Sequence, residues 1–282
     1  METKPGKLVC LFLLSLLFTA CDLFEMRGFV ASYESVNERF DQSMEWNDEH
    51  PFKTITVADD DYNIFVMADS HTGGVLNLNA FFDEAIDINA VAAVMVGDLT
   101  NGHSADYKKF DNQVPDEDVL LTFPVVGNHD LYFDGWKQFY KHFGSSTYLF
   151  TVNTATSSDL YICLDTGSGT LGSSQLNWLK DILENERQAY RYCVVFTHNN
   201  LFRIRHTTST NPCVEELRVL TDLSVRYNID VIITGHDHKR NLVVMGNTTH
   251  VTLDALKDDY KYAGYFNLHI ENGDLGYDFI NL

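Results

Sequence analysis

From residue 62 onward, short apolar runs rich in β-branched residues alternate with segments whose apolar residues recur every three or four positions. The runs predict strands over 62–68, 91–96, 120–126, 160–164, 192–196 and 231–234, and the segments between them predict helices over 78–88, 105–114, 136–143, 174–188 and 214–227. Strands that are apolar throughout are buried on both faces, as in layered α/β proteins. We therefore expect an α/β fold.

The last forty residues follow a different pattern. Pairs of short apolar runs flank the dipeptides Gly246-Asn247 and Asn272-Gly273, and such dipeptides are typical of two-residue β-hairpins. The sheets should therefore be mixed, with antiparallel strands near the C-terminus. Because neither an internal repeat nor a proline-rich linker interrupts residues 55–282, we expect one compact domain there.

The first residues look like a targeting segment. Lys4 and Lys7 precede an apolar run over 8–18 that is shorter than the ~20 residues of a spanning helix, so residues 1–20 read as a signal peptide. The ending Phe-Thr-Ala-Cys21 resembles a bacterial lipoprotein box, which implies lipidation of Cys21. We expect an exported, membrane-anchored lipoprotein on the periplasmic or cell-surface side, held by its acyl chains. An ordinary cleaved signal and a short anchor are the alternatives.

Residues 21–54 connect this segment to the domain. Apolar residues recur there at helical spacing, which predicts an amphipathic helix that docks on the body of the protein. The alternative is a partly mobile tether. The spaced residues are Phe29, Tyr33, Val36, Phe40 and Met44.

Composition narrows the function. The chain has 20 Lys and Arg against 40 Asp and Glu, a net charge of −20, which argues against a long nucleic-acid track on the surface. A hydrophobic content of 45% excludes a disordered chain. Five cysteines, of which Cys10 lies in the signal peptide and Cys21 is the expected lipidation site, do not form a disulfide framework. These features leave a globular protein that could act on small molecules, and they do not fix its oligomeric state.

Side chains that bind metals or transfer protons follow five of the six predicted strands. Ligands of open α/β sheets bind beyond the carboxyl ends of strands, so we expect these side chains to converge. Taken singly, each is as typical of a polar loop as of a ligand. In chain order they are Asp69, His71, Asp98, Asn128, His129, Asp130, His198, His236 and His238.

Seven of these nine, all except His129 and Asp130, are metal donors, too many for one four-coordinate ion. Nitrogen and oxygen donors without thiolate suit Mn, Fe, Zn or Co. Two divalent ions roughly 3.5–4 Å apart, bridged by one carboxylate, would use all seven and leave room for a shared water. Their excess positive charge over two aspartates and a bridging hydroxide would attract a phosphate.

At these residues the sequence closely resembles the calcineurin-like metallophosphoesterase family. The family's motifs D-x-H, G-D, G-N-H-D/E, a later His and G-H-x-H occur in this order across residues 69–238. The resemblance implies a four-layer α-β-β-α sandwich with mixed sheets for residues 55–282. It also implies hydrolysis of phosphate esters by a hydroxide that bridges two metals.

Motif by motif, the resemblance implies a role for each residue. One metal would be held by Asp69, His71 and His238, the other by Asn128, His198 and His236, with Asp98 bridging the two. His129 would stand beside the leaving-group oxygen as proton donor, and Asp130 would orient its ring through a hydrogen bond.

The substrate is less specified. The compact size and the segment 97–100 resemble family members that act on cyclic nucleotides and other small phosphodiesters, which favours such a substrate. A phosphomonoesterase or nucleotide phosphatase, or a metal-containing binding lipoprotein without catalysis, are the alternatives. His103, Arg203 and Arg205 are possible substrate contacts, although loop and surface roles are equally typical of them.

Overall fold

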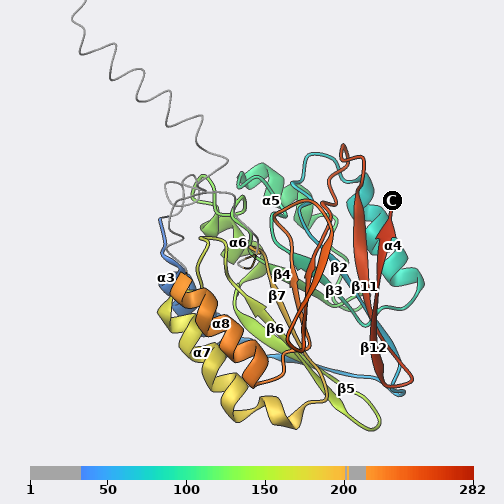
Figure 1. The fold of residues 1–282 in the computed structure, drawn as a ribbon. Helices are drawn as coiled ribbons and strands as arrows, with labels where there is room; N and C mark the ends of the chain where they lie inside the picture. The colour runs from blue at the N-terminus through green and yellow to red at the C-terminus, as the bar shows by residue number, and fades with distance from the viewer. Residues whose placement is uncertain (1–32, 201, 203–213) are drawn as a thin grey trace, which may run out of the picture.

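The computed structural model describes residues 33–200, 202 and 214–282 (Figure 1). One of its two sheets has five strands in the order β12-β11-β2-β3-β4. Strands β2, β3 and β4 are parallel, whereas β11 runs antiparallel to both β2 and β12. The strands are β2 (Tyr62–Met67), β3 (Ala92–Val96), β4 (Thr122–Val125), β11 (Gly264–Glu271) and β12 (Asp274–Asn281).

The other sheet has seven strands in the order β1-β5-β6-β7-β8-β10-β9. Its centre, from β6 to β10, is parallel, and antiparallel pairs join β5 to β6 and β9 to β10. Strand β1 pairs in parallel with β5 at the edge. The strands are β1 (Lys53–Thr56), β5 (Tyr148–Asn153), β6 (Ser158–Leu164), β7 (Cys193–Thr197), β8 (Val231–Thr234), β9 (Asn241–Met245) and β10 (Thr248–Thr252).

Helices cover the outer faces of both sheets. Apolar side chains of the two sheets, such as Val94 and Phe196, form the core between them. Helices α4 (Leu76–Asp87), α5 (Ser104–Asp111) and α6 (Trp136–Phe143) pack on the five-stranded sheet, and α7 (Gly172–Asn185) and α8 (Val214–Arg226) on the other (Figure 1). The four-layer α-β-β-α sandwich with mixed sheets is confirmed.

The edge of the larger sheet differs from the sequence prediction. Strands β1 and β5 were not predicted. Only Ile55 of the four residues in β1 is buried, so the segment lacks an apolar run, and its pairing with β5 defines it as a strand. The helix predicted over 174–188 begins at Gly172 and ends at Asn185, and a separate 3₁₀ turn, Arg187–Ala189, follows it.

Helix α3 (Val36–Glu49) precedes the sheets and packs against α7. A capping box begins it: the Ser35 hydroxyl accepts a hydrogen bond from the Glu38 amide, and the Glu38 carboxylate accepts one from the Ser35 amide. The predicted signal peptide and Cys21 lie outside the described residues. Within the described part of the chain, no helix has both the length and the apolar character needed to cross a bilayer.

Candidate metal centre

The carboxyl ends of the parallel strands in both sheets meet at one end of the sandwich. Asp69, Asp98 and Asn128 follow β2, β3 and β4, while His198 and His236 follow β7 and β8. Hydrogen bonds connect these loops across the two sheets. For example, the His236 amide donates to Oδ2 of Asp69 over 2.9 Å. The convergence predicted from the strand ends is therefore present in the structure.

One group of potential ligands consists of Asp69, His71, Asp98 and His238, and one donor atom from each lies within 4.8 Å of the others. Nε2 of His238 lies 3.1 Å from Nε2 of His71 and 3.2 Å from Oδ1 of Asp69. Oδ2 of Asp98 lies 3.7 Å from Nε2 of His71. Two carboxylates and two imidazoles thus face a common point.

A second group consists of Asp98, His198 and His236. Oδ2 of Asp98 lies 3.3 Å from Nε2 of His198. Asn128 belongs with them, because its Oδ1 is 3.2 Å from Nε2 of His198 and 2.9 Å from Nδ1 of His236. Asp98 is common to both groups, so all seven predicted donors lie in one continuous cluster.

The orientation of these side chains fits metal binding. Nδ1 of His198 lies 2.9 Å from the Val96 carbonyl, to which it can donate, so its Nε2 faces the cluster and is the nitrogen that would bind a metal. The buried Oδ1 of Asp69 makes no hydrogen bond of good geometry among the described residues, and Nε2 of His238 lies 3.2 Å from it. Burying a carboxylate oxygen is costly unless it is paired, and a cation at this place would pair with it.

The backbone at the cluster is strained. Five of the ten described non-glycine residues with positive φ are potential ligands, with angles from 41° to 69°. Residues other than glycine adopt this backbone conformation at a cost of about 1–3 kcal/mol each, and such residues concentrate at functional sites. The five are Asp69, His71, Asp98, His236 and His238.

A family model for calcineurin-like phosphoesterases matches residues 62–240, more than half of the 282-residue chain. The chain belongs to this family. The resemblance predicted from the motifs is thereby confirmed, and the protein is a metallophosphoesterase whose Asp and His groups are able to hold divalent metal ions.

Two solved structures share the fold of this phosphoesterase. A dimetal phosphatase from Danio rerio is 12% identical with a TM-score of 0.60, covering 78% of this chain and 96% of that one. GAP50, the anchor in the inner membrane complex of Plasmodium, is 14% identical with a TM-score of 0.58, covering 78% and 84%. No curated protein matches the sequence.

The buried carboxylates of the cluster attract positive charge. Burial opposes ionisation of Asp98, yet the imidazoles of His198, His129 and His71 outweigh burial and hold its pKa well below the usual range. Burial disfavours protonation of His198, but the facing carboxylate of Asp98 raises its pKa to about 10. Without a metal, His198 would take up a proton to supply the charge that these carboxylates attract.

His129 lies beside the first group. Its ring centroid is 4.6 Å from that of His71, in an edge-on arrangement, and its amide donates to Oδ1 of Asp98 over 2.7 Å. Burial lowers the pKa of His129 to about 4, with Asp98 partly opposing the shift. Its ring is therefore neutral near neutral pH in the free protein.

The prediction that Asp130 orients His129 is wrong. The fully buried Asp130 carboxylate accepts hydrogen bonds from the amides of Gly127, Leu99 and Thr100 over 2.8–3.2 Å, and from the Thr100 hydroxyl. Among described residues, no hydrogen bond joins it to the His129 ring. The side chain turns into the interior, where it ties together the loops after β3 and β4. Burial beside Asp98 raises its pKa to about 7.

Aromatic side chains border His129. The ring centroids of Tyr132 and His129 are 4.6 Å apart, and the Tyr132 hydroxyl accepts a hydrogen bond from Nδ2 of Asn128 over 3.4 Å. Phe133, which is 66% exposed, stacks on His103 with ring centroids 4.1 Å apart. His103 is thus connected to His129 through the rings of Phe133 and Tyr132. Arg203 and Arg205 lie outside the described residues.

Proposed function

We propose that this phosphoesterase uses two divalent metal ions to hydrolyse a small phosphodiester of the cyclic-nucleotide type. The observation that carries the proposal is the sharing of Asp98 between two groups of ligand atoms. One ion would be held by Asp69, His71 and His238 and the other by Asn128, His198 and His236. Ions at these places would supply a hydroxide nucleophile near neutral pH and neutralise the phosphoryl oxygens.

His129 serves the leaving group in this proposal. Its imidazole adjoins His71 and borders the cluster, so its N–H can donate to the oxygen that departs from phosphorus. The anionic phosphate beside the ring favours its protonated form and so raises the low pKa that burial imposes. Proton donation of this kind contributes typically 10²–10⁴-fold to the rate.

The aromatic border supports an organic substituent on the phosphate. Phe133 is an exposed aromatic residue with a positive φ of 57°, and it stacks on His103 beside the site. Exposed rings of this kind provide a surface on which a nucleobase can stack. A diester carries one negative charge and two organic groups, and such a ligand matches an aromatic border.

Paired assays test the substrate class. Protein reconstituted with Mn²⁺, Zn²⁺ or Fe²⁺ would be given bis(p-nitrophenyl) phosphate, p-nitrophenyl phosphate, and cyclic and linear nucleotides. We expect kcat/KM at least tenfold higher for diesters, and Phe133→Ala should raise KM for the cyclic nucleotide more than for the small chromogenic diester. A preference for monoesters would replace the proposal with a phosphomonoesterase or nucleotide phosphatase.

A binding protein without catalysis is the second candidate. It is favoured by one observation, that the fold also serves GAP50, described as an anchor. Protein that binds two ions but hydrolyses none of the four substrate types would support this candidate and overturn the enzymatic proposal.

We also propose that the protein is an exported bacterial lipoprotein anchored through Cys21. The sequence 1–21, with two lysines, an apolar run and a Thr-Ala-Cys ending, supports this proposal. The substrate would then be met on the periplasmic or cell-surface side of the membrane.

A further inference from the structure

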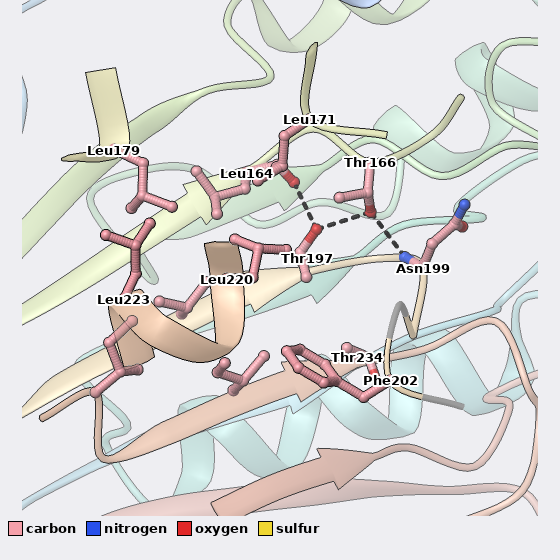
Figure 2. A pocket seen from close by; sticks show the side chains of 13 residues that line it. Leu164, Thr166, Leu171, Leu179, Thr197, Asn199, Phe202, Leu220, Leu223 and Thr234 are labelled. Carbon is pink, nitrogen blue, oxygen red and sulfur yellow. Dashed lines mark hydrogen bonds between the residues drawn. The ribbon is translucent and has the colours of Figure 1, made fainter. Parts of the chain in front are cut away.

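The loop that follows β6 lies between two segments that carry potential ligands of the second group. On one side, Oγ1 of Thr166 lies 2.7 Å from Oγ1 of Thr197 and accepts a hydrogen bond from the Asn199 amide over 2.8 Å. Figure 2 shows these hydrogen bonds at the end of an apolar cavity between the sheet and helices α7 and α8. Thr166 thus contacts both neighbours of His198.

On the other side, the same loop packs against the segment that carries Asn128. A Cβ atom on Gly167 would come within 2.8 Å of the Leu131 side chain and 3.0 Å of the Gly127 carbonyl, so the backbones are already in close contact. The loop 165–167 therefore supports His198 from one direction and Asn128 from another.

This loop is fixed by a buried ion pair with helix α3. Asp165 accepts two hydrogen bonds from Arg39, from Nε over 2.7 Å and from Nη2 over 3.1 Å, and the two side chains are 0% and 1% exposed. Oδ1 of Asp165 also accepts a hydrogen bond from the Gly167 amide, and Nη2 of Arg39 donates to Ser168. A two-point pair of this type fixes orientation as well as distance.

We propose that Arg39 is a positioning residue for the second metal: through Asp165 it holds the loop that sets the relative positions of His198 and Asn128. Arg39 lies outside residues 62–240, the part that matches the family. Helix α3 would accordingly help to position the ligands of the second metal, in addition to connecting the domain to the N-terminus. The inference rests on the proposed pair of ions, but metal binding tests it separately from catalysis.

The chain contains a matched control. Asp159, at the other end of β6, forms a two-point pair with Arg191 over 2.7 and 3.0 Å, and Asp159 is fully buried. Both arginines bind an aspartate at an end of the same strand, but Arg191 lies at the end away from the ligands. Arg39→Met and Arg191→Met therefore remove similar interactions at different distances from the cluster.

Metal-free full-length protein is titrated with Mn²⁺ by calorimetry, and the coupling between the two bound Mn²⁺ ions is followed by electron paramagnetic resonance. Wild type should bind two ions and show the spectrum of coupled manganese. Loss of residues that support ligands typically weakens metal affinity 10–100-fold. Arg39→Met should weaken the affinity for the second ion by that factor and leave the affinity for the first unchanged. The coupled spectrum should then be replaced by that of isolated Mn²⁺.

The controls separate positioning from general stability. Arg39→Lys keeps the charge but loses the two-point geometry, so it should weaken the affinity for the second ion less than Arg39→Met does. If Arg39→Met does not fold, the lysine variant alone tests whether Arg39 positions the second metal. Arg191→Met should bind both ions within about twofold of wild type. Equal loss of both ions in both methionine variants, unchanged binding in the Arg39 variants, or a wild type with one ion would overturn the inference. Two ions without hydrolysis would overturn only the proposed function.

Discussion

Oδ1 of Asn128 lies 2.9 Å from Nδ1 of His236, and the two residues follow strands of different sheets, β4 and β8. The contact shows that the cluster exists only when the two sheets face each other. The same holds for the hydrogen bond from the His236 amide to Asp69. Metal binding and packing of the sandwich are therefore expected to support one another.

Replacing Asp98 by Asn should remove most of the bound metal. The change keeps the shape of the side chain but removes the charge that both ligand groups share. Metal content measured by mass spectrometry should fall from two ions to fewer than one, and turnover should fall with it. Retention of two ions would contradict the assignment of Asp98 as the bridging ligand.

Removing metal should destabilise the folded protein. An ion that binds only the folded state stabilises it by about 2.7 kcal/mol at a free concentration 100 times its Kd, so chelation should lower Tm by several degrees. Differential scanning calorimetry with a chelator, followed by excess Mn²⁺, measures the effect. The increase in Tm on adding Mn²⁺ should be absent in Asp98→Asn, and a Tm indifferent to metal in wild type would contradict the prediction.

His129→Ala should lower turnover by about 10²–10⁴-fold, because it removes the proposed proton donor. Metal content should remain that of wild type, since His129 belongs to neither ligand group. A substrate with a leaving group that needs no proton, such as a p-nitrophenyl ester, should be affected much less than a cyclic nucleotide. Loss of metal in this variant would show that His129 is a ligand.

Asp130→Ala should destabilise the fold. The substitution leaves the buried amides of Gly127 and Thr100 without an acceptor, and a buried group left unsatisfied costs about 1–3 kcal/mol. We expect the free energy of unfolding to fall by about 3 kcal/mol in urea titrations. If Asp130 instead oriented His129, the variant would lose turnover as His129→Ala does while keeping its stability.

Cys21→Ser should release the protein from membranes. Lipid attachment requires the thiol, and the acyl chains are the proposed link to the bilayer. Fractionation of cells expressing wild type and variant, followed by immunoblotting, measures the change. Continued association of the variant with the membrane would contradict the lipoprotein proposal.

Much of the site was predictable because its chemistry is local to the strand ends. Apolar runs such as 91–96 predicted buried strands, and the polar residues directly after them, such as Asp98, were therefore expected at one end of the sheet. Strand β1 was not predictable from its own residues, because only Ile55 of its four residues is buried and the pairing with β5 defines it.

Asp130 shows the limit of reading a motif along the chain. Its position next to His129 predicted a hydrogen bond between them, but the direction of a side chain depends on which neighbours need an acceptor. The amides of Gly127, Leu99 and Thr100 come from two loops, and the carboxylate lies between them.

The sequence by itself determined the strands and helices of an α/β fold and the identity of the potential ligands, because periodicity and residue type are properties of short segments. The four layers were implied by the resemblance to the family. Tertiary structure decided which of these residues meet, and it revealed the pairing of Arg39 with Asp165, 126 positions apart. No spacing rule links residues so distant in the chain. Their contact arises because helix α3 packs against α7 and β5, which places Arg39 beside the residue after β6, where a buried carboxylate requires a partner.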